Sequence, residues 1–274
     1  MWMAIALLHT GASISGTSFT VHPSTVIGII GLAALYEWGH RRTHRSGRAV
    51  WFYTGLVTMF FALNGWLHDL SDSYLFSAHM VQHLLLAFAV APLLVMGLTA
   101  DMLRPVLAVR GVGAVARWIT SPIPAFAIFN VVVAAWHLPP LYNFALAHHP
   151  VHIAQHLMFL AASVIMWWPV LSPAPELPRL SYPGQMLYLF LMSIPMSIVA
   201  VYIAYADQIL YPLYASAPRV WAITPMNDQL IGGLIMWIPG GLYFYTIISV
   251  VFYRWQQRDG VDSRAGAQVD WVRS

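Results

Sequence analysis

The chain has 274 residues, of which 59% are hydrophobic and 8% are charged, and its mean hydropathy is +0.66. A soluble domain carries about 25% charged residues, so this composition excludes a water-soluble fold and places most of the chain in a bilayer. The formal net charge of +3 comes from arginines in the loops and gives no indication of nucleic-acid binding. There is no cysteine, which excludes disulfides and thiolate ligands and leaves 12 histidines and 13 methionines as candidate metal ligands.

Apolar segments taken in chain order predict an all-α, polytopic membrane helix bundle, because about 20 apolar residues cross a bilayer as a helix. Seven transmembrane helices are expected, at residues 24–40, 50–67, 75–98, 122–138, 151–171, 185–205 and 230–253. They form one transmembrane domain over residues 1–255, and a polar tail over residues 256–274 is expected in the cytoplasm. The segments between the spans are expected to be loops, the longest of which carry Arg104, Arg110 and Arg117 or follow residue 205.

The arginines support this topology, because cytoplasmic loops of membrane proteins carry an excess of positive residues. With the amino terminus outside and the carboxyl terminus in the cytoplasm, Arg219 is the one arginine that falls outside. The others fall on the cytoplasmic side: Arg41, Arg42, Arg45, Arg48, Arg104, Arg110, Arg117, Arg179, Arg254, Arg258, Arg264 and Arg273. Of the 12 histidines, only His40 and His44 share that side, so charge and imidazole are sorted to opposite faces.

Two of the spans begin with the same pattern, His-x-x-Gln-His-Leu. It places His79 and His83 at the start of the third span, and His152 and His156 at the start of the fifth. Residues four apart share one face of a helix, and imidazoles inside a membrane are costly and usually functional. We therefore expect the two helices to be neighbours with these faces toward each other, since imidazoles facing lipid would be unpaired.

The motifs lie in a possible tandem repeat of helical hairpins. The tripeptide WLH precedes the first motif and WHL precedes the second, so His68 and His137 lie at the outer ends of the partner helices. Spans six and seven are a possible degenerate third copy, in which Met226 and Asp228 replace the histidines.

Imidazoles and thioethers gathered at one depth favour a transition metal. The candidate ligands are His68, His79, His83, His137, His152 and His156, with Met192, Met196 and Asp228 as additions. Each has a structural interpretation as well. A lone histidine at a helix end commonly caps a carbonyl, methionine fills cores, and Asp228 could cap a helix amino terminus. For the paired histidines, the repetition of the motif favours the functional interpretation.

Further segments add to these motifs: AWHLPPLY from Ala135, MSIPMS from Met192 and NDQLIGGLIMW from Asn227. Together with AHMVQHLLL and HIAQHL they resemble the CtaG family of cytochrome c oxidase assembly factors, the seven-span proteins associated with caa3-type oxidases. The resemblance covers roughly residues 22–255. It implies a protein of the bacterial plasma membrane that helps to mature a haem–copper oxidase by handling copper at the outer face. The implied partners are oxidase subunits or other copper chaperones, and a homo-oligomer is compatible with this role.

Three functions are therefore compared. The first is a copper-handling assembly factor that is not an enzyme. The sequence contains no hydrolase or ATP-binding motif that would support an enzymatic function instead. The second is an electron carrier with bis-histidine haem b, which the doubling of each histidine disfavours because a haem takes one ligand from each helix. The third is a transporter or channel, which would need polar groups across the full depth. Zinc remains an alternative metal, since three or four imidazoles suit it.

Overall fold

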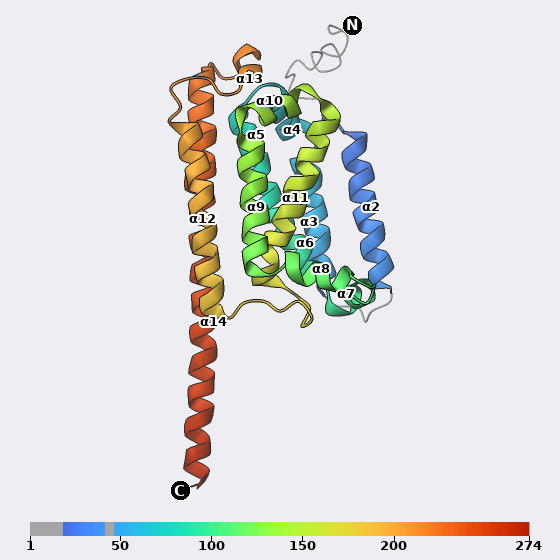
Figure 1. The fold of residues 1–274 in the computed structure, drawn as a ribbon, viewed down its shortest axis with the longest axis vertical. Coiled ribbons are helices and arrows are strands. Elements are labelled where there is room, and N and C mark those ends of the chain that lie inside the picture. Colours follow the sequence, from blue (N-terminus) through green and yellow to red (C-terminus); the bar gives the residue numbers. More distant parts are fainter. Residues whose placement is uncertain (1–18, 42–46, 274) are drawn as a thin grey trace.

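The computed structural model describes residues 19–41 and 47–273, with side chains up to Arg258, and within these ranges every regular element is a helix. Figure 1 shows a bundle of roughly parallel helices beside which α14 runs past one end. The elements are α2 (Pro23–His40), α3 (Ala49–Ala62), α4 (Gly65–Ser73), α5 (Phe76–Leu84), η1 (Leu85–Val90), α6 (Ala91–Gly97), α7 (Ala100–Leu107), α8 (Val112–Ile119), α9 (Pro122–His137), α10 (Pro139–Ala147), α11 (His149–Leu171), α12 (Tyr182–Ala204), α13 (Pro212–Ser216) and α14 (Pro225–Arg273).

Four helical segments are long and apolar enough to cross a membrane: Phe76–Gly97, His149–Leu171, Tyr182–Ala204 and Pro225–Arg258. Two bent helix pairs raise this to six if each pair is one span: α3 with α4, bent by 48°, and α8 with α9, bent by 72°. The chain is thus an all-helical membrane protein. The helix α2 coincides with the first expected span but is not among these candidates, so the count of seven stays a prediction.

The observed helices differ from the predicted ones at several places in the described residues. The second span was predicted to run to residue 67, but α3 ends at Ala62 and the chain bends through Asn64 into α4. Gly65 has φ of 65°, a left-handed conformation that glycine adopts readily. The segments predicted as loops after residues 98, 138 and 205 contain short helices: α7 and α8, α10, and α13. The last helix, α14, continues past the predicted end at residue 253 to Arg273.

The central span is α5–η1–α6, which contacts α3, α4, α11 and α14. Its middle is a π-helix, in which the wider winding changes the backbone hydrogen bonding. Two of its carbonyls accept side-chain hydrogen bonds: Ala87 O from Trp167 Nε1 at 2.7 Å and Phe88 O from Tyr243 OH at 2.5 Å. These bonds tie α11 and α14 to the span that carries the first histidine motif.

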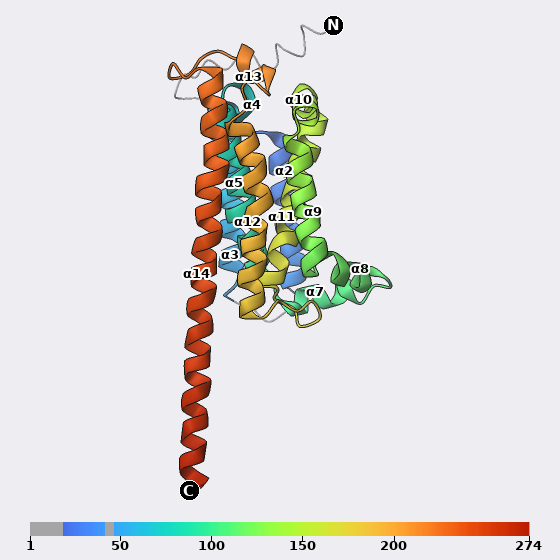
Figure 2. The ribbon, with the colours of Figure 1, turned by 60° about the vertical axis from the view of Figure 1, so that its left-hand side comes forward.

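The two ends of the bundle differ in chemistry. We call the end with α4, α10 and α13 the histidine end, and the opposite end with α7 and α8 the arginine end (Figures 1 and 2). At the arginine end, Arg104 Nε lies 2.8 Å from Glu176 Oε1, and this hydrogen bond holds the pKa of the Glu176 carboxyl below its usual value. In the described residues, Arg104 and Arg117 lie on α7 and α8 at this end, whereas both histidine motifs begin toward the other end, with His40 and Arg219 as exceptions. Arg42 and Arg45 lie outside the described residues, and which end faces the cytoplasm stays a prediction.

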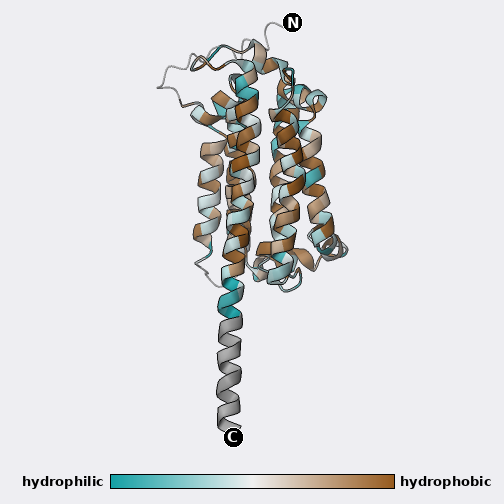
Figure 3. Ribbon diagram, turned by 90° about the vertical axis from the view of Figure 1, so that its left-hand side faces the viewer, coloured by the Kyte–Doolittle hydropathy of each residue, from teal (hydrophilic) through white to brown (hydrophobic). Residues whose placement is uncertain are grey.

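The hydropathy of α14 changes where this helix leaves the bundle. In Figure 3 the helices of the bundle are mostly coloured as hydrophobic, and a hydrophilic band lies on α14 where it passes the arginine end of the bundle. Pro225–Arg258 is the part of α14 that qualifies as a span. The apolar part of α14 therefore lies alongside the bundle, and the part of α14 after Arg258 projects beyond the arginine end.

Candidate metal centre

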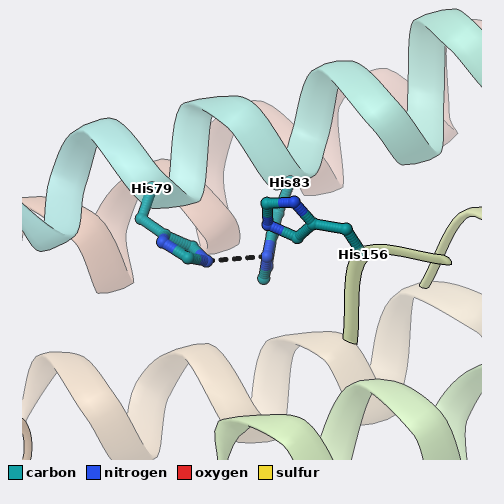
Figure 4. Close-up of side chains that lie close together, drawn as sticks. All are labelled: His79, His83 and His156. Atoms are coloured by element: carbon teal, nitrogen blue, oxygen red, sulfur yellow. Dashed lines mark hydrogen bonds between the residues drawn. The ribbon is translucent and has the colours of Figure 1, made fainter. Parts of the chain in front are cut away.

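The first motif places two imidazoles in direct contact on one face of α5. His79 and His83 are 0% and 3% exposed, and their Nε2 atoms lie 2.8 Å apart, as the dashed line in Figure 4 marks. At this distance one nitrogen donates an N–H and the other accepts it through its lone pair. The spacing of four residues produces this contact, as expected for neighbours on one helix face.

The second motif meets the first from α11. The ring centroids of His79 and His152 are 5.5 Å apart, and those of His83 and His156 are 5.6 Å apart. One side-chain nitrogen from each of His79, His83 and His156 lies within 4.8 Å of the others, and Figure 4 shows the three rings gathered between the helices. This confirms the prediction that the motif helices are neighbours facing each other. We call these three residues the imidazole group.

A carboxylate that was not among the predicted ligands joins a second group. Ligand atoms of Asp72, His79 and His152 also lie within 4.8 Å of one another, and we call these three the acidic group. Asp72 Oδ2 is 3.4 Å from His68 Nε2 and 3.6 Å from His152 Nδ1. The available sequence signal was the spacing of His68 and Asp72, four residues apart on α4.

Hydrogen bonds from neighbouring helices orient the rings. Gln82, the glutamine of the first motif, donates from Nε2 to Ala62 O at 2.7 Å and lies 3.0 Å from His68 Nδ1. Tyr214 OH donates to Ser71 O at 2.7 Å and lies 3.2 Å from His79 Nδ1. Burial raises the pKa of the Tyr214 hydroxyl well above its usual value, so this group stays protonated and keeps its donor. Sequence reasoning missed Tyr214, because α13 lies far from the motifs along the chain.

The remaining predicted histidines lie at the edge of the imidazole group. The His137 ring is 5.7 Å from that of His83, and its Nδ1 is 2.7 Å from Val133 O. The His68 ring is 6.5 Å from that of His156. Neither ring belongs to the two groups of mutually close ligand atoms found among the described residues.

The predicted methionine and aspartate ligands have different surroundings. Met196 lines a small cavity together with His83 and His137. Met192 Sδ instead lies 3.6 Å from Asn130 Nδ2, which donates to it. The carboxylate of Asp228 accepts from Phe76 N at 2.7 Å and from Ser77 N at 3.0 Å, so it caps the amino terminus of α5. This is the capping alternative for Asp228, although the capped helix is α5 and not its own.

Several buried ring nitrogens of this region have no hydrogen-bond partner in the described part of the chain. They are His83 Nδ1, His137 Nε2, His152 Nε2 and His156 Nε2. Leaving a polar atom unpaired in an apolar interior is unfavourable, and native structures contain few of them. Convergent, neutral imidazole nitrogens with one nearby carboxylate fit the donor set of a copper or zinc ion.

A large cavity borders the centre. It has a volume of about 670 Å³ and lies between α2 and α11, with a wall that is apolar over most of its length. His68, Asp72, His152 and His156 contribute to its lining. Gly28 and Gly31 of α2 face open space, so α2 stands away from α11 along this stretch.

Comparison with known proteins matches the sequence of this chain to a family model. The family model described as cytochrome c oxidase caa3 assembly factor (Caa3_CtaG) matches residues 33–258. The chain is 25% identical over 252 residues to uncharacterised proteins of Mycobacterium bovis and Mycobacterium tuberculosis, covering 85% of this chain and 38% of each relative. It is 24% identical over 246 residues to an uncharacterised protein of Mycobacterium leprae, covering 82% of this chain and 37% of that protein. The chain thus spans less than two fifths of the curated relatives that it matches. No solved structure matches it.

Proposed function

Because the chain belongs to the family of cytochrome c oxidase caa3 assembly factors, we propose that it binds copper at the imidazole group and passes it to an oxidase subunit. The observation that carries this proposal is the convergence of His79, His83 and His156, whose ligand atoms lie within 4.8 Å of one another. These side chains come from two helices that share one motif, so their meeting follows from the repeat.

The donor chemistry supports copper as the cargo. Imidazole nitrogens dominate the centre, Met196 lies beside it, and Asp72 is the one carboxylate in the two groups. Hard cations such as Mg²⁺ require several oxygen ligands, which this centre does not supply. Copper accepts imidazole in either oxidation state and thioether in the reduced one. The nearby side chains of His68, His137 and His152 would offer further nitrogen ligands as the ion enters or leaves.

The protein acts by binding and transfer, without turnover of a substrate. In this proposal, it lies in the bacterial plasma membrane with the histidine end outside, where a copper-receiving oxidase subunit would meet it. The arginines of α7 and α8 at the opposite end support this orientation, since positive residues favour the cytoplasmic side. Loss of the site should therefore leave an oxidase assembled without its full copper content.

The experiment compares variants in cells that lack the native protein. His79→Ala/His83→Ala should lower the copper content and activity of the oxidase at least tenfold, while the variant still inserts in the membrane because the apolar segment after His83 is unchanged. The control is His148→Ala, an exposed histidine at the same end that bonds Phe144 O. Normal oxidase copper with the double variant would contradict the proposal. An intense Soret band from the purified parent would favour the haem b alternative.

A further inference from the structure

A chain of hydrogen bonds determines which nitrogen of His83 carries the proton. Tyr214 OH donates its single hydrogen to Ser71 O, so its contact with His79 Nδ1 at 3.2 Å requires that His79 Nδ1 donates. The neutral His79 ring then accepts at Nε2, and the proton in the 2.8 Å contact comes from His83 Nε2. His83 Nδ1 is therefore left as a lone pair.

The same reasoning assigns the proton of His137. Its Nδ1 is 2.7 Å from Val133 O, and a carbonyl can only accept, so Nδ1 carries the hydrogen and Nε2 is a lone pair. His83 Nδ1 and His137 Nε2 are both buried with no hydrogen-bond partner in the described residues. Their rings are 5.7 Å apart and nearly perpendicular, at 83°.

Both of these rings line a small cavity, and His79 is not among its lining residues. Its volume is about 20 Å³, enough for a single ion or water. Met80 of α5, Met196 of α12 and Met236 of α14 contribute to its wall, and the rest of the wall is apolar. All three methionines are at most 4% exposed. The Met196 methyl group packs against Gly240, since a Cβ built at that glycine would lie 2.5 Å from it.

We infer that this cavity is a second copper site, specific for Cu(I), with His83 Nδ1 and His137 Nε2 as nitrogen ligands and thioethers from Met80, Met196 and Met236 completing the coordination. Soft thioethers and neutral imidazoles in an otherwise apolar cavity, with no carboxylate in its lining, select a monovalent soft ion over Cu(II) or Zn(II). We call this the thioether site. The inference rests on the proposed function and specifies the path of the metal within it.

His83 links the thioether site to the imidazole group. A neutral imidazole has one lone-pair nitrogen, so His83 ligates through Nε2 in the imidazole group or through Nδ1 in the thioether site, one at a time. Moving between them requires the ring proton to change from Nδ1 to Nε2, where it bonds to His79 again. Filling one site therefore weakens the other.

The test uses the purified full chain under anaerobic conditions and makes two measurements. Competition with a chelator gives the Cu(I) affinity, and X-ray absorption at the copper edge identifies the ligand atoms. The parent should bind Cu(I) with sulfur in its coordination sphere. The triple variant Met80→Leu/Met196→Leu/Met236→Leu conserves side-chain volume and should lose the sulfur signal and at least tenfold in Cu(I) affinity. Its Zn(II) affinity should stay within about twofold of the parent, because the imidazole group is intact. Met192→Leu, a buried methionine one turn away on α12, is the matched control and should change neither affinity.

Two outcomes would overturn the thioether site and leave the proposed function standing. One is a triple variant that binds Cu(I) as tightly as the parent, which would mean that the cavity holds water only. The other is a parent whose bound Cu(I) has nitrogen ligands alone, in which case the proposed function stands and this inference fails. A parent that binds neither Cu(I) nor Cu(II) would reject both. Folding of the triple variant is checked by the retained Zn(II) affinity.

Discussion

At the scale of single residues, Tyr214 decides how His79 presents its ligand nitrogen. Its hydroxyl accepts from His79 Nδ1, which makes Nε2 the lone-pair nitrogen of His79 and therefore its candidate ligand atom. Tyr214→Phe removes that acceptor and should weaken metal binding at the imidazole group by about 10- to 100-fold, the usual effect of losing a hydrogen bond to a ligating histidine. The measurement is Zn(II) or Cu(II) affinity of the purified variant.

The control for this substitution is Tyr188→Phe. Tyr188 is also buried and donates to a backbone carbonyl, Met166 O, at 2.9 Å. It should lower stability without changing metal affinity. Equal affinities for Tyr214→Phe and the parent would show that Tyr214 does not orient His79.

Asp228 gives a second residue-scale prediction, which separates capping from ligation. Its carboxylate accepts from two backbone amides of α5 and from Ser77 Oγ at 2.5 Å. Asp228→Asn should lower the free energy of unfolding by about 1–3 kcal/mol, since buried charge-assisted bonds are lost. The metal affinity of Asp228→Asn should change less than twofold. The control is Asp207→Asn, a change at an exposed aspartate that should leave the free energy of unfolding unchanged. Unfolding in detergent measures the stability of the variants, and a metal titration measures their metal affinity. A large loss of metal affinity at unchanged stability would show that Asp228 is a ligand.

The predictability of the site follows from where its residues lie along the chain. The pairs His79/His83 and His152/His156 could be found because a spacing of four residues fixes one helix face, and the repeat of the motif marks both helices. That the two helices are neighbours with these faces toward each other was predictable from the cost of unpaired imidazoles in lipid. Asp72 and Tyr214 could not be assigned, because their approach to His79 depends on how α4 and α13 fold back over the bundle.

At the scale of helices, close packing of α14 on α12 holds the bundle together. A Cβ at Gly233 would lie 2.7 Å from Ala204 N, so Gly233→Ala should force the two helices apart and lower stability by about 1–3 kcal/mol. Gly241, on the same helix, faces open space, and Gly241→Ala should be neutral or stabilising by up to about 1 kcal/mol. Unfolding of both variants in detergent tests this. Equal stabilities would mean that α12 and α14 do not pack closely at Gly233.

The positions of the apolar helices were largely predictable, and their interruptions were not. Apolar length identifies a span, which is why the predicted 151–171 and the observed His149–Leu171 nearly coincide. The break at Asn64 depends on tertiary contacts: its side chain accepts from His22 N at 2.7 Å and donates to Phe60 O at 2.9 Å. Such contacts stabilise a bend that a count of apolar residues does not reveal.

At the scale of the whole molecule, the bent pair α3–α4 should count as one span. Reporter fusions after Gly47 and after Ser73 should then report opposite sides of the membrane, with Gly47 in the cytoplasm. A fusion after Arg110, between α7 and α8, should agree with the Gly47 fusion. Identical results for Gly47 and Ser73 would make the pair re-entrant and would place the histidine and arginine ends on one side.

The central claim is that this membrane protein carries copper on its paired histidines. The most direct measurement is the copper content of protein purified from copper-replete membranes, for the parent and for His79→Ala/His83→Ala at equal yield. The parent should retain copper, and the double variant should lose at least nine tenths of it, because both α5 ligands of the imidazole group are gone. Equal copper in the two proteins would show that the paired histidines are structural and would contradict the claim.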